Sequence, residues 1–296
     1  MASSASSPWQ EFHPSLRDLA DLAPRCHDVP TARGVLAESH ELFRNAIAHE
    51  EDPFLLTAWY SHVVREALLS PAVQHAGGWT SSSHPVLTGA VGRGEALPDS
   101  PIEWLWWEEG TLRPDETDTL SGLLEEAGLP YRESTLTPRT IIDVSEEDLG
   151  TPVHPLSDEQ RISLLRHAVE HTPPAVHAAD GGLPDLSASL HIRDHLLVPI
   201  VHVAQWATAT TPGSEHTTLH RLEVARDAGA LTDAEQSALS QGFRSGVRLQ
   251  LQRWSDRVYD SDVSVADLPA LQRSEYGAAA REVAQALHAL SSRILG

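Results

Sequence analysis

The chain has 296 residues and a formal net charge of −21, and all of its 21 basic Lys and Arg positions are arginine, because lysine is absent. Without lysine, the chain can use neither a Schiff-base lysine nor the lysine that clamps phosphate in a P-loop. The negative charge argues against a nucleic-acid partner, since proteins that bind nucleic acids normally present a basic face. The length allows one large domain or two ordinary ones.

Cys26 is the single cysteine. The chain can therefore form neither an internal disulfide nor a cysteine metal cluster, which is typical of a reducing compartment. Residues 1–8 lack the basic start and the apolar stretch of a signal peptide. No apolar run reaches the ~18 residues of a membrane span. We expect an acidic cytoplasmic protein with no membrane partner.

Residues 1–76 form the first predicted segment, in which apolar side chains recur at helical spacing from residue 14 onward. The apolar residues of the three predicted helices are Leu16, Leu19 and Leu22, then Val35, Leu36, Leu42, Phe43 and Ile47, then Leu55, Leu56, Trp59, Val63, Val64, Ala67 and Leu68. Four prolines lie at the boundaries of these helices, two near starts and two near ends, namely Pro24, Pro30, Pro53 and Pro71.

Strand signals begin in the second predicted domain, residues 77–172. The predicted strands are Val86–Thr88, Ile102–Trp107 and Thr140–Val144. Residues 120–127 predict a short helix that ends at a glycine C-cap, Gly128. We expect a small mixed sheet with flanking helices.

A predicted loop rich in Pro, Gly and Asp, residues 172–188, precedes the third predicted domain, residues 189–296. This domain is predicted to be helical, with helices over about 196–207, 217–228, 232–254 and 268–295. A capping box, Thr232 with Glu235, starts the third of these helices. The short connections favour an antiparallel four-helix bundle. The expected fold class is therefore α+β.

A glycine-rich segment, Gly89-Ala-Val-Gly92-Arg93-Gly-Glu95, lies upstream of Ser100-Pro101-Ile102-Glu103. A glycine turn, an Arg-Gly-Glu and a Ser-x-x-Glu before an apolar strand resemble the layout of the nucleotidyltransferase superfamily. In that layout the last segment reads Ser-Asp-x-Asp, and the resemblance implies that its two aspartates hold the divalent metals that carry a nucleoside triphosphate.

The third domain carries a second series of motifs in order. They are Pro199-Ile-Val201, Thr218-Leu-His-Arg221-Leu222, Gly229-Ala-Leu-Thr232 and Val247-Arg-Leu-Gln-Leu-Gln252. This series resembles the C-terminal substrate-binding domain of the nucleotidyltransferase family known as domain of unknown function 294. The resemblance implies a nucleotidyltransferase-like domain followed by its substrate-binding domain.

The departures from the family pattern fall on the chemistry. The phosphate-binding serine is Ala90, the first metal aspartate is Pro101, and the second is the longer Glu103. Nucleotidyl transfer depends on two metal ions held by carboxylates, and a proline cannot bind Mg²⁺. Asp143 is the candidate for a third carboxylate. The metal motif is thus degenerate.

The resemblance assigns the candidate site residues. Glu103 and Asp99 are the catalytic candidates, and Glu103 with Asp143 would hold Mg²⁺ or Mn²⁺ if the site keeps a metal at all. The nucleotide-binding candidates are Gly89, Gly92, Arg93, Glu95 and Arg221. One hypothesis is a regulatory protein that binds a nucleotide or a protein partner through a degenerate site. The alternative is an active metal-dependent nucleotidyltransferase that modifies a protein or a small molecule.

Three other groups of residues have alternative interpretations. His167 and His171 have the i, i+4 spacing of zinc helices, but such pairs also arise by chance in a chain with 17 histidines. His191, His195 and His202 either line a cleft or, as we favour, occupy polar surface positions. Trp104, Trp106 and Trp107 could stack a base, but tryptophans in a strand more often belong to the core.

Overall fold

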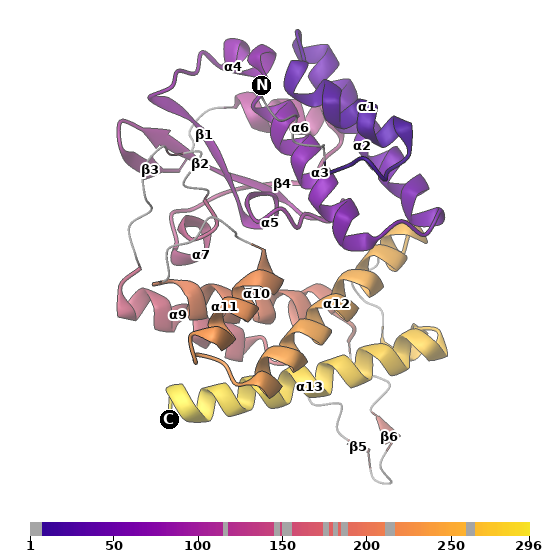
Figure 1. The fold of residues 1–296 in the computed structure, drawn as a ribbon, viewed down its shortest axis with the longest axis vertical. Helices are drawn as coiled ribbons and strands as arrows, with labels where there is room; N and C mark the ends of the chain where they lie inside the picture. Colours follow the sequence, from indigo (N-terminus) through magenta and orange to yellow (C-terminus); the bar gives the residue numbers. More distant parts are fainter. Residues whose placement is uncertain are drawn as a thin grey trace, which may run out of the picture. The chain divides into compact units, whose positions relative to one another are not determined.

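Two units build the chain, residues Met1–Pro152 and Val153–Gly296 (Figure 1). The computed structural model describes residues 8–114, 118–144, 149, 156–173, 178–179, 183–184, 189–210, 217–258 and 264–296. This division is coarser than the three segments expected from the sequence. None of the helices in these ranges has both the length and the apolar character needed to cross a membrane.

The first unit begins with helices, as predicted. They are α1 (Pro14–Leu22), η1 (Ala23–Arg25), α2 (Val29–Ala48), α3 (Pro53–Leu68) and α4 (Pro71–Gly77). Each has a proline in its first turn, where the fixed φ suits a helix and no backbone N–H is needed. Asp28 and Asp52 cap α2 and α3 by accepting hydrogen bonds from backbone N–H groups. Local sequence thus sets these helix starts.

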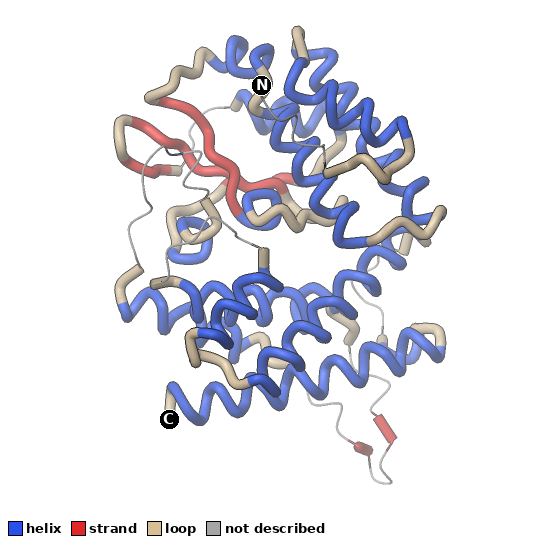
Figure 2. The backbone as a smooth tube through the Cα atoms, in the orientation of Figure 1, coloured by secondary structure: helices blue, strands red, loops and turns tan. Residues whose placement is uncertain are grey.

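A four-stranded mixed sheet follows, consistent with the predicted α+β class (Figure 2). Its strands are β1 (Ser83–Thr88), β2 (Ile102–Glu108), β3 (Thr111–Arg113) and β4 (Tyr131–Glu133). β2 pairs antiparallel with β1 and β3, and parallel with β4. Trp104 and Trp106 of β2 are buried, which confirms the core interpretation for these two, whereas Trp107 is half-buried.

Three short helices border the sheet: α5 (Gly89–Gly92), α6 (Thr119–Ala127) and α7 (Pro138–Ile141). Gly128 ends α6 in the left-handed conformation, as predicted. The predicted strand Thr140–Val144 is wrong, because its start is the end of α7. Thr137 and Thr140 form a capping box around Pro138 that favours a helical turn. The apolar pattern there reflects burial, since Val144 is fully buried.

The second unit is helical. Its elements are α9 (Asp158–Glu170), β5 (Ala178–Ala179), β6 (Leu183–Pro184), η2 (Arg193–Leu197), α10 (Val198–Thr208), α11 (Thr218–Asp227), α12 (Asp233–Ser255), η3 (Val265–Asp267) and α13 (Ala270–Ile294). The four predicted helices are present as α10 to α13, and α9 packs against α10 and α13 in the same unit. The Thr232–Glu235 capping box is confirmed at the start of α12.

The predicted loop 172–188 differs from the structure in one respect. It contains a short antiparallel pair, β5 with β6, in which Ala178 pairs with Pro184 and Ala179 with Leu183. Apart from these strands and residues 172–173, the predicted loop lies outside the described residues.

Candidate functional site

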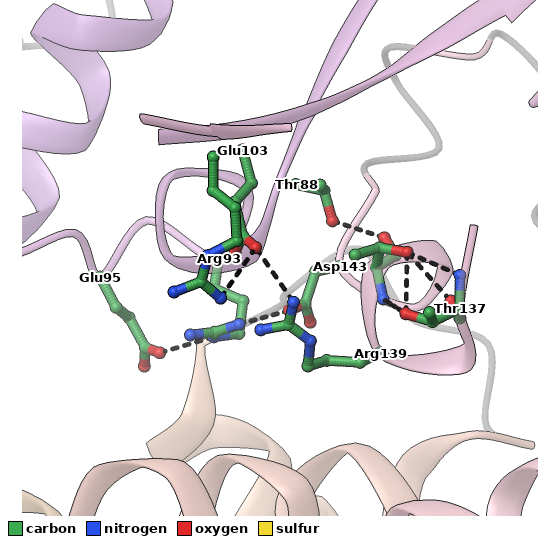
Figure 3. A network of polar contacts seen from close by, with 9 residues as sticks. Thr88, Arg93, Glu95, Glu103, Thr137, Arg139 and Asp143 are labelled. Atoms are coloured by element: carbon green, nitrogen blue, oxygen red, sulfur yellow. Dashed lines mark hydrogen bonds and ion pairs between the residues drawn. The ribbon is translucent and has the colours of Figure 1, made fainter. Parts of the chain in front are cut away.

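The ends of β1, β2 and α7 bring most of the candidate residues of the first unit together. Thr88, the last residue of β1, lies opposite Glu103 in the β1–β2 register. The Thr88 hydroxyl donates a hydrogen bond to the backbone carbonyl of Thr140, which fastens α7 to the end of β1. In Figure 3 the side chains of Glu103, Arg93, Asp143 and Arg139 point toward one another. Residues distant in sequence therefore form one polar cluster.

Gly89 makes room for the Glu103 carboxylate, and Gly92 for the backbone carbonyls of Asp143 and Leu87. Gly89 has φ of 62°, and a Cβ built on it would overlap the Glu103 carboxylate. A Cβ on Gly92 would lie 2.5 Å from the carbonyl oxygen of Asp143 and 3.0 Å from that of Leu87. Real Cβ atoms do not approach oxygen this closely. Both glycines of the motif are therefore required by packing around Glu103 and Asp143, whatever ligand the site takes.

Arg93 forms a buried ion-pair set with two acidic residues. Its guanidinium pairs with the Asp143 carboxylate, and its Nε lies 3.2 Å from Glu95 Oε2. The side chains of Arg93, Glu95 and Asp143 are 11%, 11% and 0% exposed. Burial by itself lowers the pKa of Arg93, but Asp143 and Glu95 more than offset it and the net pKa is raised. Arg93, the expected phosphate ligand, is thus held by carboxylates of its own chain.

Glu103 faces two further arginines that the sequence analysis missed. Arg139 Nη2 lies 3.0 Å and Arg132 Nη1 3.7 Å from Glu103 Oε1. The parallel register of β2 with β4 sets Arg132 beside Glu103, and α7 supplies Arg139. The signal in the sequence is the presence of two arginines, Arg132 and Arg139, in the segment that follows Glu103. No single sequence motif contains both arginines and Glu103, because strand pairing brings Arg132 to Glu103 and α7 brings Arg139.

Asp99, the other catalytic candidate, lies in a loop that is anchored to the helices. Within this loop the Ala96 backbone N–H donates to Ser61 Oγ of α3 at 2.8 Å, and the Leu97 N–H donates to Ser100 Oγ at 3.0 Å. The charge of Asp99 acts on two groups of α2 and α3, His40 and Tyr60.

These two groups form a hydrogen-bonded pair, with His40 Nε2 2.9 Å from the Tyr60 hydroxyl. Burial, and then the charge of Arg44, lowers the pKa of His40, against a smaller opposing effect of Asp99. Burial, and then Asp99, raises the pKa of Tyr60. The charge of Asp99 thus acts on groups of α2 and α3.

A divalent metal needs carboxylate oxygens that face a common point. Here Glu103 Oε1 faces Arg139 and Arg132, and Asp143 Oδ2 faces Arg93. Within the described ranges, no group of three or more His, Cys, Asp or Glu residues has an arrangement that could hold a metal ion. This arrangement does not fit the two-metal centre that the family resemblance implies. Binding of Mg²⁺ or Mn²⁺ by Glu103 and Asp143 stays a prediction.

The second unit holds the remaining candidates. Arg221 lies in α11 with 4% of its surface exposed. The rings of His167, His171 and His202 lie 5.8 to 6.3 Å apart between centroids. His202 is buried, so its interpretation as a surface position is wrong; it faces into the unit from α10.

The other two histidines of that group are half-buried. The His191 and His195 rings are 5.4 Å apart, and His195 Nδ1 lies 2.8 Å from the Tyr276 hydroxyl. The contact with Tyr276 ties the η2 segment to α13 within the second unit.

Residues 163–294, from within α9 to the end of α13, match the family described as "Putative nucleotidyltransferase substrate binding domain". The match supports a domain of this family over that segment. No curated protein matches the sequence. The family predicted from the motifs of residues 199–252 is thereby confirmed for the C-terminal half.

The substrate-binding domain contains Arg221 and all of the histidines at positions 167 to 202 that were singled out in the sequence. The matched range begins after the polar cluster of the first unit, so the roles assigned to residues 89–103 and to Asp143 stay predictions. The match supports a nucleotidyltransferase-like protein.

Proposed function

We propose that this protein is a nucleotidyltransferase relative with a degenerate active site, which acts in regulation by binding a nucleotide or a protein partner. The observation that carries the proposal is the pairing of Glu103 with Arg139 and of Asp143 with Arg93. The carboxylates that would hold metal ions in an active enzyme neutralise arginines instead. Phosphoryl transfer relies on positioned metals and charges, so their loss costs orders of magnitude in rate.

The substrate-binding domain supports this proposal from the other half of the chain. A domain that recognises the acceptor substrate of a transferase can keep a binding surface after the transfer chemistry is lost. A protein or small-molecule partner would then occupy the second unit, and the nucleotide would occupy the first.

The test combines a transfer assay with a binding assay. The full chain is incubated with α-³²P-labelled ATP, GTP, CTP or UTP and with Mg²⁺ or Mn²⁺, and label transfer and pyrophosphate release are measured. We expect neither to exceed the background of heat-inactivated protein. Thermal unfolding with the same nucleotides should show a rise in Tm for at least one of them, because binding to the folded state stabilises it by mass action.

Metal-dependent transfer that Glu103→Gln abolishes would contradict the proposal and establish the alternative, an active nucleotidyltransferase. Glu108→Gln is the matched control, since Glu108 is the last residue of the same strand and pairs with Arg113 outside the cluster. Transfer that both variants retain would indicate a contaminating enzyme.

A further inference from the structure

We propose that His40 is a pH-sensitive anchor, which fastens the loop of residues 96–100 to helices α2 and α3 and releases it when the imidazole ring is protonated. This loop joins the glycine-rich segment 89–95 to β2, the strand that carries Glu103. Such a release does not depend on which ligand the site binds, and it therefore goes beyond the proposed function.

The loop of residues 96–100 is buried although its backbone is irregular. Ala96, Leu97 and Ser100 are 1%, 2% and 2% exposed. A buried backbone N–H needs a hydrogen-bond acceptor. The Ala96 N–H donates to Ser61 Oγ of α3, the Leu97 N–H to Ser100 Oγ, and the Ser100 N–H to the Leu97 carbonyl. These three amides therefore report whether the loop is closed.

His40 of α2 connects this loop to both helices. Its Nε2 lies 2.9 Å from the hydroxyl of Tyr60 in α3, and its ring also forms a hydrogen bond with the backbone of Pro98. Because a proline has no backbone N–H, the ring must be the donor in the bond to Pro98. A neutral imidazole has one donor and one acceptor nitrogen. Nδ1 therefore donates to Pro98, and Nε2 accepts from Tyr60.

Protonation of His40 is incompatible with this pair of bonds. The added proton occupies Nε2, so the ring can no longer accept a hydrogen bond from the Tyr60 hydroxyl. Tyr60 is fully buried, and burial followed by the charge of Asp99 raises its pKa. The tyrosine therefore keeps its own proton and needs a different acceptor. Loss of a hydrogen bond by a buried hydroxyl is costly.

The charges around His40 come from α2 and from the loop, whereas α3 contributes the uncharged tyrosine. Arg44 of α2 disfavours the charged ring, and Glu41 of α2 and Asp99 of the loop favour it. Burial first, and then Arg44, outweigh the carboxylates and the bond to Pro98, so the pKa of His40 is lowered. Once the loop opens, the ring takes up a proton below pH ~6.5 that the attached ring resists. The anchor is therefore fully effective above that pH and weakens as the pH falls.

The experiment is hydrogen–deuterium exchange of the full chain at pH 7.5 and at pH 5.5. Mass spectrometry follows peptides that cover residues 91–101, and the rates are corrected for the intrinsic effect of pH on amide exchange. We expect protection of the loop amides to fall severalfold at pH 5.5. In His40→Gln the protection should stay level between the two pH values, because an amide side chain donates and accepts hydrogen bonds without titrating.

His62→Gln is the matched control. His62 is a half-buried histidine of α3 whose pKa is also lowered, chiefly by burial. The charged groups that act on it are Glu66, Arg65 and Asp21, none of which belongs to the loop. This variant should keep the pH dependence of loop protection. If His62→Gln abolished that dependence as His40→Gln does, the loop would be responding to global stability, and the anchor would be disproved.

A second measurement uses the unaltered chain and does not require that a variant folds. Long-range ¹H–¹⁵N NMR at pH 7.5 should show the neutral His40 ring with its proton on Nδ1 and none on Nε2. A proton on Nε2 would overturn the proposal, since the ring could not then donate to Pro98 through Nδ1. Loop protection that is equal at both pH values in the unaltered chain, or that falls equally in His40→Gln, would overturn it as well.

Discussion

At the scale of single residues, two glycines of the motif with a left-handed backbone, Gly89 and Gly94, differ in their surroundings. Gly89 and Gly94 both have positive φ, 62° and 73°, but only at Gly89 would a Cβ meet a neighbouring side chain. Around Gly94, no heavy atom of the described structure lies within 4 Å of the Cβ position. A substitution at Gly94 therefore tests backbone strain alone, whereas one at Gly89 tests strain together with steric overlap.

We expect Gly94→Ala to lower the free energy of unfolding by about 1 kcal/mol, the cost of a left-handed alanine. Gly89→Ala should cost about 1–3 kcal/mol more, because its methyl group must displace the Glu103 carboxylate. Urea denaturation followed by tryptophan fluorescence measures both. Equal losses for the two variants would show that Glu103 does not approach Gly89 as described.

Asp143 is a buried partner of Arg93. Replacing it with Ala leaves the guanidinium with Glu95 as its remaining carboxylate in the cluster. Removing one member of a buried ion pair leaves the charge of the other buried and less compensated. We therefore expect Asp143→Ala to lower the free energy of unfolding by about 3 kcal/mol. Asp143→Asn keeps a hydrogen-bond acceptor and should cost less. A change below about 0.5 kcal/mol for Asp143→Ala in chemical denaturation would argue against the buried pair.

At the scale of elements, a capping box fixes where α12 begins. Thr232 accepts from the Glu235 backbone N–H at 3.2 Å, and the Glu235 carboxylate accepts from the Thr232 N–H at 2.8 Å. Glu235 also pairs with Arg293 of α13 at 2.7 Å. Thr217 occupies the same position at α11, where the described structure shows no capping bond from its side chain.

Thr232→Ala should therefore destabilise the chain by about 1 kcal/mol, the usual cost of losing an N-cap. Thr217→Ala, the matched control, should change the free energy of unfolding by less than about 0.5 kcal/mol. Thermal unfolding of the two variants side by side checks this. A larger loss of stability for Thr217→Ala than for Thr232→Ala would contradict the capping geometry.

Glycines inside helices have opposite roles in α12 and α2. A Cβ on Gly246 of α12 would lie 2.7 Å from Leu197 Cδ2 and 3.1 Å from Leu196 Cβ. Gly34 of α2 is exposed, and in the described structure nothing lies within 4 Å of its Cβ position. The first glycine permits close helix packing, whereas the second only weakens its helix.

We expect Gly246→Ala to destabilise the chain by about 1–3 kcal/mol through overpacking. Gly34→Ala should stabilise it by about 0.5–1 kcal/mol, since alanine is the better helix former. In chemical denaturation, the two substitutions should change the free energy of unfolding in opposite directions. A stabilising Gly246→Ala would mean that α12 does not pack tightly on residues 196 and 197.

At the scale of the whole molecule, stability should depend on pH through partly buried histidines. Burial is the main cause that lowers the pKa of His40, His62 and His195 from the ordinary value. Below pH ~6.5 the unfolded chain therefore binds protons that the folded chain does not, so the free energy of unfolding falls as the pH falls. Above that pH the contribution is fully present.

Denaturation between pH 7.5 and 5.5 at fixed ionic strength should show this loss of stability. His195→Gln should make the fall shallower, because it removes one of the three titrating groups while an amide can still bond to the Tyr276 hydroxyl. Stability that stays level or rises as the pH drops would disprove the assignment.

The sequence by itself determined the helices, their caps and the identity of the C-terminal domain. These features depend on neighbouring residues: Pro in a first helical turn, Thr232 three residues before Glu235, and apolar side chains at helical spacing. The α+β class followed from the same local patterns, as did the core position of Trp104 and Trp106.

Only the tertiary structure decided how the candidate site is arranged. Residues 140–144 read as a strand, but the Thr137–Thr140 capping box makes a helical turn there and places Asp143 beside Arg93. Arg132 reaches Glu103 through the parallel pairing of β4 with β2. A sequence motif contains residues that are close in the chain, whereas the partner of each carboxylate comes from a distant segment. The fold places arginines against Glu103 and Asp143, the residues for which the sequence predicted metal ions.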